Sequence, residues 1–306
     1  MKKNKFLFCI GLLLTVATIV NAQSVTWISS TEGNVWQKSK VKLQSKSEQN
    51  PVLQVDGTEN GVAFKNWGTT FNELCWDALG LLTRTEQDEI LYNIFSPQGD
   101  LRITRGRISM GANDYARSWY SCDEVEGDFE LRYFNINRDK QTIIPFIRAA
   151  QKYNPNLTFW ISPWCPPSWM KINGDYPVLS SPFNSLSEKQ NYLLYGATGG
   201  QVDENEMKLT GARDGVFPRQ LATTDFMIQD PRYLQTYADY FCRFIDAYKE
   251  QGIPIDMVMY QNEAYSYTPY PGCAWTATGT IRFNKEYLAP TLRQMHPEVK
   301  LYLGTF

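Results

Sequence analysis

Residues able to do chemistry are concentrated at one point of the sequence, where an apolar run of strand character ends in an Asn-Glu pair. Residues 257–260 (MVMY) lead through Gln261 into Asn262 and Glu263. In a parallel α/β barrel a substrate reaches the carboxyl ends of the strands, so a polar pair at that position favours a catalytic site. A carboxylic acid at position 263 could donate a proton. The alternative is a solvated Glu that ends a strand.

The loop after this pair is rich in aromatic residues, namely Tyr265, Tyr267, Tyr270 and Trp275. Enzymes that cleave glycosidic bonds need a carboxylic acid at the scissile oxygen. Flat sugar faces cover aromatic rings, while sugar hydroxyls bond to nearby polar groups. Part of the aromatic content must fill the core. The aromatic residues at the strand ends, including those of this loop, predict a carbohydrate-binding site in which Trp275 is one of the contacts.

Two earlier strand ends also carry charged side chains. Residues 66–73 end in Glu73, which could accept hydrogen bonds from sugar hydroxyls, or could simply begin a helix, where the helix dipole favours it. The second strand contains Arg107 and is followed by Asp114. Arg107 could hold catalytic carboxylates in their ionised form, or could be a structural ion-pair partner.

A third strand end, residues 162–171, contains three prolines and two tryptophans. Proline restricts φ and removes backbone donors, so this loop is expected to be rigid and to hold an indole, such as that of Trp164, over a binding pocket. The alternative is that both tryptophans pack in the core.

Apolar strands alternate with helical patterns along the chain, which predicts a parallel sheet built from βαβ units. Strands are expected over residues 62–71, 101–108, 157–162, 255–260 and 299–303, and helices over 85–95, 140–153, 233–251 and 283–295. A (β/α)8 barrel of the TIM type needs eight strands. We therefore expect an α/β chain of TIM-barrel type that is truncated after about five strands. Residues 176–232 form a long polar connection, typical of a lid or a disordered segment.

The chain begins with a basic segment, a short apolar run and small residues before Gln23. This pattern predicts a secretory signal peptide over residues 1–22, cleaved after Ala22, because the run is too short to span a membrane stably. Residues 23–59 are expected to form lead-in strands and residues 60–306 a partial barrel domain. The mature protein is expected to be exported.

Composition argues against several classes of function. The formal net charge is −2 and the sequence pI is about 5.6, so nothing indicates binding to nucleic acid or to an anionic membrane. The spacing of the six cysteines and the single histidine, His296, predicts no metal site and no cofactor. One disulfide, Cys122 with Cys273, and buried free thiols are both compatible with the spacing.

Five motifs follow one another along the chain: residues 66–73 (NWGTTFNE), 106–108 (GRI), 126–131 (EGDFEL), 162–171 (SPWCPPSWMK) and 261–263 (QNE). Taken in this order, they resemble glycoside hydrolase family 30, which includes the lysosomal glucosylceramidase and bacterial β-1,6-glucanases. The resemblance covers about residues 60–306. Two motifs depart from the family: Asn-Glu-Pro reads Asn262-Glu263-Ala264, and Gly-Phe-Gly-Gly appears as residues 66–69 (NWGT).

The resemblance implies a (β/α)8 barrel with an attached β-sandwich, and cleavage of β-linked glycosides with retention. It implies that Glu263 is the acid/base and that Asn262 bonds to the sugar 2-hydroxyl. By the same resemblance, Arg107 would steady the carboxylates, and the sugar-binding pocket would contain Glu73, Trp164 and Asp114.

In the family the nucleophilic carboxylate comes from the seventh strand, whereas only five strands are found here. We therefore expect this chain to lack the nucleophile and the C-terminal β-sandwich, to be inactive as printed, and to be poorly soluble because a sheet edge is exposed. Export favours β-glucan as the substrate over glucosylceramide, and polysaccharide breakdown as the process over sphingolipid metabolism. The alternative function is a non-catalytic carbohydrate-binding protein that keeps the aromatic cleft.

Overall fold

The computed structural model describes residues 24–42, 61, 66–187 and 224–305. The predicted signal peptide lies outside the described residues, and so do residues 188–223 of the long predicted connection. The chain divides into two compact units, Met1–Ala63 and Phe64–Phe306.

The first unit contains an antiparallel hairpin of β1 (Ser24–Thr31) and β2 (Asn34–Lys42). Its pairing places Val25 opposite Val41 and, on the other face, Thr26 opposite Lys40. All but one of the hairpin residues are exposed. The hairpin lies within the predicted lead-in segment.

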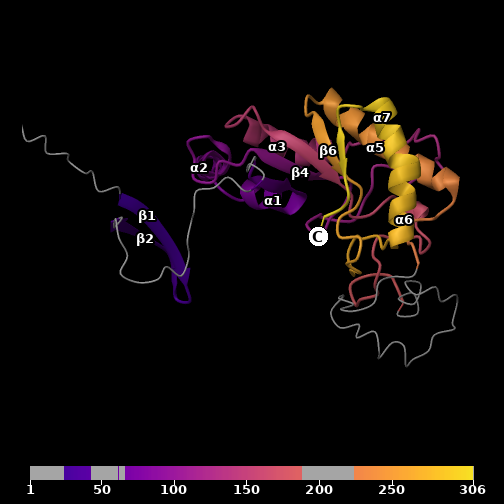
Figure 1. Ribbon diagram of the computed structural model, residues 1–306, viewed down its shortest axis with the longest axis horizontal. Helices are drawn as coiled ribbons and strands as arrows, with labels where there is room; N and C mark the ends of the chain where they lie inside the picture. Colours follow the sequence, from indigo (N-terminus) through magenta and orange to yellow (C-terminus); the bar gives the residue numbers. More distant parts are fainter. Residues whose placement is uncertain (1–23, 43–60, 62–65, 188–223, 306) are drawn as a thin grey trace, which may run out of the picture. The chain divides into compact units, whose positions relative to one another are not determined.

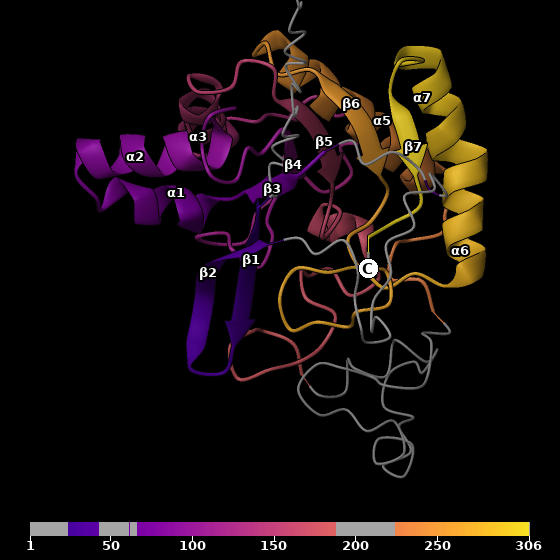
Figure 2. The same ribbon diagram turned by 60° about the vertical axis from the view of Figure 1, so that its left-hand side comes forward.

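The second unit is built on a parallel sheet whose five strands follow one another in chain order, β3-β4-β5-β6-β7 (Figure 2). The strands are β3 (Gly68–Phe71), β4 (Arg105–Ser109), β5 (Thr158–Ser162), β6 (Ile255–Met259) and β7 (Lys300–Tyr302). Helices connect consecutive strands, as in part of an α/β barrel. The predicted fold class, a partial barrel of about five strands, is confirmed.

The second barrel strand begins later than predicted, at Arg105 rather than at residue 101. The backbone N–H groups of Leu101 and Ile103 donate to the carbonyls of Asn93 and Ile94, near the end of the preceding helix. Arg102 also adopts a left-handed φ of 53°. Because Leu101 and Ile103 bond to the helix end, the pairing with the β3 segment begins only at Thr104, whose N–H donates to the Trp67 carbonyl at 3.0 Å.

The described part of the second unit contains nine helical segments. The α-helices among them are labelled in Figure 1. The nine segments are α1 (Glu73–Gly80), α2 (Arg84–Phe95), the 3-10 turn η1 (Asp139–Gln141), α3 (Ile143–Gln151), the 3-10 turn η2 (Ser168–Met170), α5 (Pro231–Glu250), α6 (Ala277–Arg282), the π-helical η4 (Phe283–Leu288) and α7 (Ala289–Met295). The helix α1 was not expected from sequence periodicity. Its start is marked by an N-cap, in which the Asn72 side chain accepts a hydrogen bond from the Cys75 N–H. No helix among the described residues is both long enough and apolar enough to cross a membrane.

The two faces of the sheet differ in burial. Phe71, Ile108, Ile161 and Val258 form one row across β3 to β6, and each is fully buried. Among the helices, α3 contacts β3 and α5 contacts β6. Side chains alternate along a strand, so Arg107 belongs to the opposite, less buried face. This alternation places Arg107 and Ser162 on the face away from the helical layer.

Gly106 of β4 lies in close contact with two aromatic rings, so a larger residue there should be destabilising. A Cβ added at Gly106 would lie 2.6 Å from the Phe71 ring and 2.8 Å from the Phe159 ring. We expect Gly106→Ala to lower the free energy of unfolding by about 1–3 kcal/mol, because rings in a filled core must shift to accept it. Urea denaturation of the full chain measures this value. The matched control is Gly80→Ala, since no heavy atom lies within 4 Å of a Cβ at Gly80. Equal stability of the two variants would contradict the packing argument.

Candidate active site

Asn262 connects three of the strand ends. Its backbone N–H donates to the Pro163 carbonyl at 2.8 Å, just after β5. Its side-chain Oδ1 accepts from Arg107 Nη2 at 2.6 Å and from Thr305 Oγ1 at 3.0 Å. Two donors on Oδ1 fix the orientation of the amide, because only the oxygen end can accept them. The described residues provide no hydrogen-bond acceptor for Nδ2, so the NH2 group is available to a ligand.

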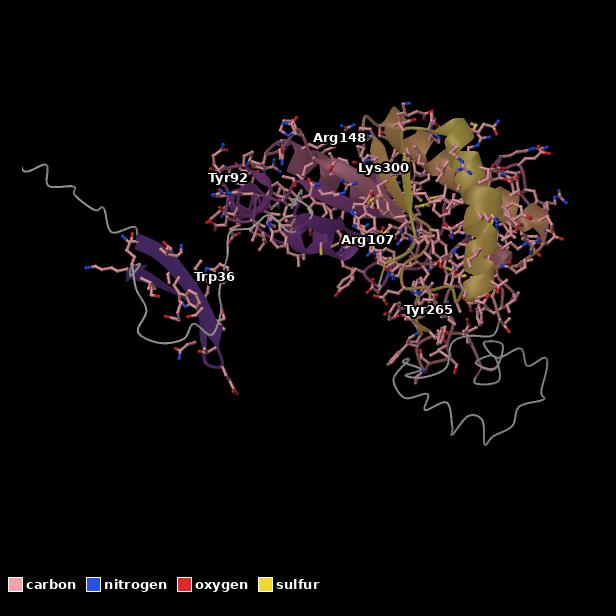
Figure 3. All side chains as sticks on the ribbon, in the orientation of Figure 1. Trp36, Tyr92, Arg107, Arg148, Tyr265 and Lys300 are labelled. Atoms are coloured by element: carbon pink, nitrogen blue, oxygen red, sulfur yellow. The ribbon has the colours of Figure 1, made fainter. Side chains whose placement is uncertain are left out.

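Arg107 is the cation of this cluster (Figure 3). Its guanidinium donates twice to Ser162 Oγ, at 2.7 and 3.1 Å, and its carbon Cζ lies 4.0 Å from the centre of the Trp164 ring and 4.9 Å from that of Trp160. Burial lowers the pKa of Arg107 to about 10, and the negative charges of Asp114 and Glu263 oppose this change. The side chain therefore remains charged at neutral pH.

Glu263 occupies a strained turn. Its φ of 47° is left-handed, which is uncommon for a residue other than glycine and costs about 1–3 kcal/mol. The turn is held by backbone bonds: the Glu263 N–H donates to the Thr305 carbonyl at 3.1 Å, and the Ser266 N–H donates to the Glu263 carbonyl at 2.8 Å. The side chain is only partly buried. Backbone strain of this kind is often found at active sites.

Asp114 and Tyr270 lie within electrostatic reach of Glu263. Desolvation raises the pKa of Asp114, and the charge of Glu263 raises it further, while Arg107 acts in the opposite direction. Desolvation also raises the pKa of Tyr270, with contributions from Asp114, Glu263 and Tyr115. The structure thus brings together Asn262, Glu263, Arg107, Asp114 and Trp164 from the predicted set.

Trp275 is placed differently from the sequence prediction. Its indole is fully buried, stacks on Phe283 and meets Tyr260 edge to face. Its Nε1–H donates to Gln261 Oε1 at 3.2 Å. The structure gives this indole a packing role in place of the predicted substrate contact, because no part of the ring is exposed. Of the other aromatic residues in the loop, Tyr267 is also buried, whereas Tyr265 is exposed (Figure 3).

Glu73 is also placed differently. It is 2% exposed and its two oxygens accept from Arg138 Nε at 2.8 Å and Nη2 at 2.6 Å, and from the backbone N–H of Arg117 at 2.8 Å. Burial alone would raise the pKa of Glu73, but these bonds outweigh it and lower the pKa. Glu73 therefore takes the alternative role, a paired carboxylate at the start of α1, in place of a contact in the sugar-binding pocket.

Three residues of the cluster were not assigned from the sequence. Ser162 accepts from Arg107, Thr305 donates to Asn262, and the buried Gln261 joins Asn262 to neighbouring loops. Ser162 and Thr305 lie at or just after the end of an apolar strand, the same signal that pointed to Asn262. Within the described ranges, no group of three or more His, Cys, Asp or Glu side chains could hold a metal, and Cys75, Cys122, Cys165, Cys242 and Cys273 are all free thiols.

The family model of the glycosyl hydrolase family 30 TIM-barrel domain matches residues 64–181. This chain is related to glycosyl hydrolase family 30. The match contains β3, β4 and β5, and therefore Arg107, Asp114 and Trp164. The resemblance stated from the motifs is confirmed.

Two relatives and one solved structure are similar to this chain over more of its length than the family model covers. A Caenorhabditis elegans protein named "Putative glucosylceramidase 3" is 27% identical over 91% of this chain and 47% of its own length. Endo-1,6-beta-D-glucanase neg1 of Aspergillus fumigatus is 25% identical over 80% of this chain and 45% of its own length. SrfJ from Salmonella typhimurium has the same fold, with a TM-score of 0.63 and 18% identity over 90% of this chain and 52% of that structure. The chain thus spans about half the length of these proteins.

The effect of the Glu263 charge on Asp114 can be measured in this chain. We expect Glu263→Gln to lower the pKa of Asp114 toward its usual value, because a like charge that raises it is removed. The titration of the Asp114 carboxyl carbon, followed by NMR with selectively labelled aspartate, gives this pKa. Glu130→Gln is the control, since Glu130 is exposed and paired with Arg132. An Asp114 midpoint that is the same in all three proteins would contradict the arrangement.

Proposed function

We propose that this cluster is the acid/base centre of a retaining β-glycoside hydrolase that acts on β-linked glucosides or β-glucan. The observation that carries the proposal is the Asn262-Glu263 pair, held at the strand ends with the amide orientation fixed by Arg107 and Thr305. The family 30 relationship supports the same reaction class.

Each residue has a role that its contacts support. Asn262 Nδ2 donates to the sugar 2-hydroxyl, because its oxygen end is already occupied. Glu263 gives its proton to the glycosidic oxygen as the bond to the anomeric carbon breaks, and later takes a proton from water. Arg107 balances the negative charge of Glu263 and Asp114. Asp114, exposed beside them, accepts from further sugar hydroxyls. Trp164 supports the guanidinium through its ring.

Retention needs a second carboxylate at ~5 to 5.5 Å from the acid/base to attack the anomeric carbon. The described contacts assign no residue to this role: Glu73 is held by Arg138, and Asp114 is given to substrate binding. We propose that residues 1–306 supply the acid/base and the hydroxyl contacts, and not the nucleophile. This division makes the reaction dependent on an added nucleophile.

The proposed substrate is a β-glucan. Among the relatives, one is named an endo-1,6-beta-D-glucanase and another a lysosomal acid glucosylceramidase of Mus musculus. We propose that the chain is exported after cleavage near Ala22, as its amino-terminal pattern predicts. Outside the cell, polysaccharide is a more accessible substrate than a membrane lipid, and this favours β-glucan.

Leaving-group dependence tests the acid role of Glu263. The full chain is assayed with aryl β-glucosides in the presence of azide, which can replace an absent carboxylate nucleophile. We expect Glu263→Gln to lower the rate about 10²- to 10⁴-fold with a phenyl leaving group, which needs protonation, and only slightly with 2,4-dinitrophenyl, which does not. Glu130→Gln is again the control. Equal losses with both substrates would contradict proton donation by Glu263.

The reaction product shows whether the chain supplies the acid/base alone or the nucleophile as well. The absence of any product, with binding retained, would indicate the non-catalytic function. Azide forms its bond to the anomeric carbon as the bond to the aglycone oxygen breaks, and that oxygen takes the proton of Glu263. An α-glucosyl azide from a β-glucoside places azide where the nucleophile would be. Turnover without azide would show that the chain supplies both carboxylates. Binding of glucan oligosaccharides by calorimetry, without turnover in either condition, would favour the non-catalytic carbohydrate-binding function.

A further inference from the structure

Gln261 lies directly before the Asn262-Glu263 pair, and its side chain has no exposed surface. Nε2 donates to the Trp164 carbonyl at 2.7 Å and to the Asn262 carbonyl at 2.9 Å. Oε1 accepts from the Trp275 indole at 3.2 Å. Both ends of the amide are therefore used, and its orientation is fixed.

The partners of Gln261 belong to separate segments of the cluster. Trp164, on the loop after β5, supports the guanidinium of Arg107. Asn262 carries the amide whose oxygen accepts from Arg107 and Thr305. Trp275 lies in the loop beyond Glu263, and its backbone N–H donates to the Ala264 carbonyl at 3.2 Å. The Gln261 backbone carbonyl also accepts from the Thr305 N–H at 3.3 Å. One buried residue thus connects the loops on both sides of Glu263.

The bonding pattern requires an amide at this position. One end must donate to two carbonyls and the other must accept from an indole N–H. An ionised carboxylate accepts but cannot donate, and would place a negative charge against the carbonyls of Trp164 and Asn262. An apolar side chain would leave all three partner groups buried and unpaired, which is costly in a dry environment.

We propose that Gln261 is a positioning residue that holds the Asn262-Glu263 peptide in its left-handed turn, and so aims the Glu263 carboxyl at the scissile bond. The turn has an unfavourable φ at Glu263 and persists only while its surroundings restrain it. Three restraints meet there: Gln261 Nε2 on the Asn262 carbonyl, Thr305 on the Glu263 N–H, and Pro163 on the Asn262 N–H. The catalytic consequence of this inference depends on the proposed glycosidase function.

Hydrogen exchange tests the positioning role without any substrate. In Gln261→Glu, we expect the amides of Asn262, Glu263 and Ser266 to exchange about 10- to 100-fold faster than in the wild-type chain, because the turn opens more often. Amides of α2 should be unchanged. The matched control is Asn154→Asp: Asn154 is a buried amide just before β5, at the other end of that strand, and donates to the Ile103 carbonyl at 3.2 Å.

Kinetics with azide and aryl β-glucosides provides the second readout. We expect Gln261→Glu to lower kcat about 10-fold or more with the phenyl leaving group, with little change in KM and a smaller loss with 2,4-dinitrophenyl. Trp275→Phe, which removes only the indole N–H donor, should give a weaker form of the same pattern. Asn154→Asp should leave the ratio between the two leaving groups unchanged.

The outcomes separate this inference from the proposed function. If the wild-type chain neither binds nor cleaves glucosides, the glycosidase proposal fails, and exchange at residues 262–266 still decides whether Gln261 holds the turn. If Gln261→Glu exchanges there like the wild type, or speeds exchange equally throughout the second unit, the positioning role is overturned. If exchange rises locally while both leaving groups lose rate equally, Gln261 holds the turn without aiming the proton donor.

Discussion

The candidate site depends on one acceptor atom, Asn262 Oδ1, which receives hydrogen bonds from Arg107 and Thr305. Arg107 belongs to β4 and Thr305 lies just after β7, and these two strands are separated in the sheet by β5 and β6. Parallel strands in sequential order end at a common edge, so residues far apart in the chain can meet there. Because both donors occupy the oxygen, the NH2 end of Asn262 has a defined direction. Without this pair of bonds, the amide could rotate and the orientation of the adjacent turn would be less restrained.

Charge is balanced in the cluster by a partly buried arginine and two carboxylates on its more open side. Burial weakens the affinity of Arg107 for its proton, while Asp114 and Glu263 restore part of it. The guanidinium also lies over the Trp164 ring, so its faces and its edges both have partners. An arginine suits this position better than a lysine, because its planar group can stack and donate in several directions together. Through its bond to Asn262 Oδ1, the guanidinium adds a contact directly beside the Glu263 turn.

Much of the barrel could be predicted from sequence, because apolar strands and amphipathic helices have distinct periods. The strand-end rule also found Asn262, Glu263, Arg107 and Asp114 in one cluster. It failed for Glu73, whose partner Arg138 is 65 residues away and carries no local signal. It failed for Trp275 because composition does not tell whether a loop folds back onto the core. The helix α1 was not among the helices expected from periodicity and entered only as the alternative for Glu73, because its signal is a single cap, Asn72, and not a repeated pattern.

Aromatic content proved a weaker guide to the site than the polar pair. Trp275, Tyr237, Tyr240, Tyr248 and Tyr267 are among the largest fully buried side chains, so much of the aromatic excess fills the core. Buried tyrosine and tryptophan need partners for their polar atoms. Trp275 meets this need by bonding to Gln261, which in turn bonds beside Asn262. The aromatic loop therefore acts on the site through its hydrogen bonds and packing, and Tyr270 shares the electrostatic environment of Glu263. A function inferred from ring stacking alone would have chosen the wrong side chain.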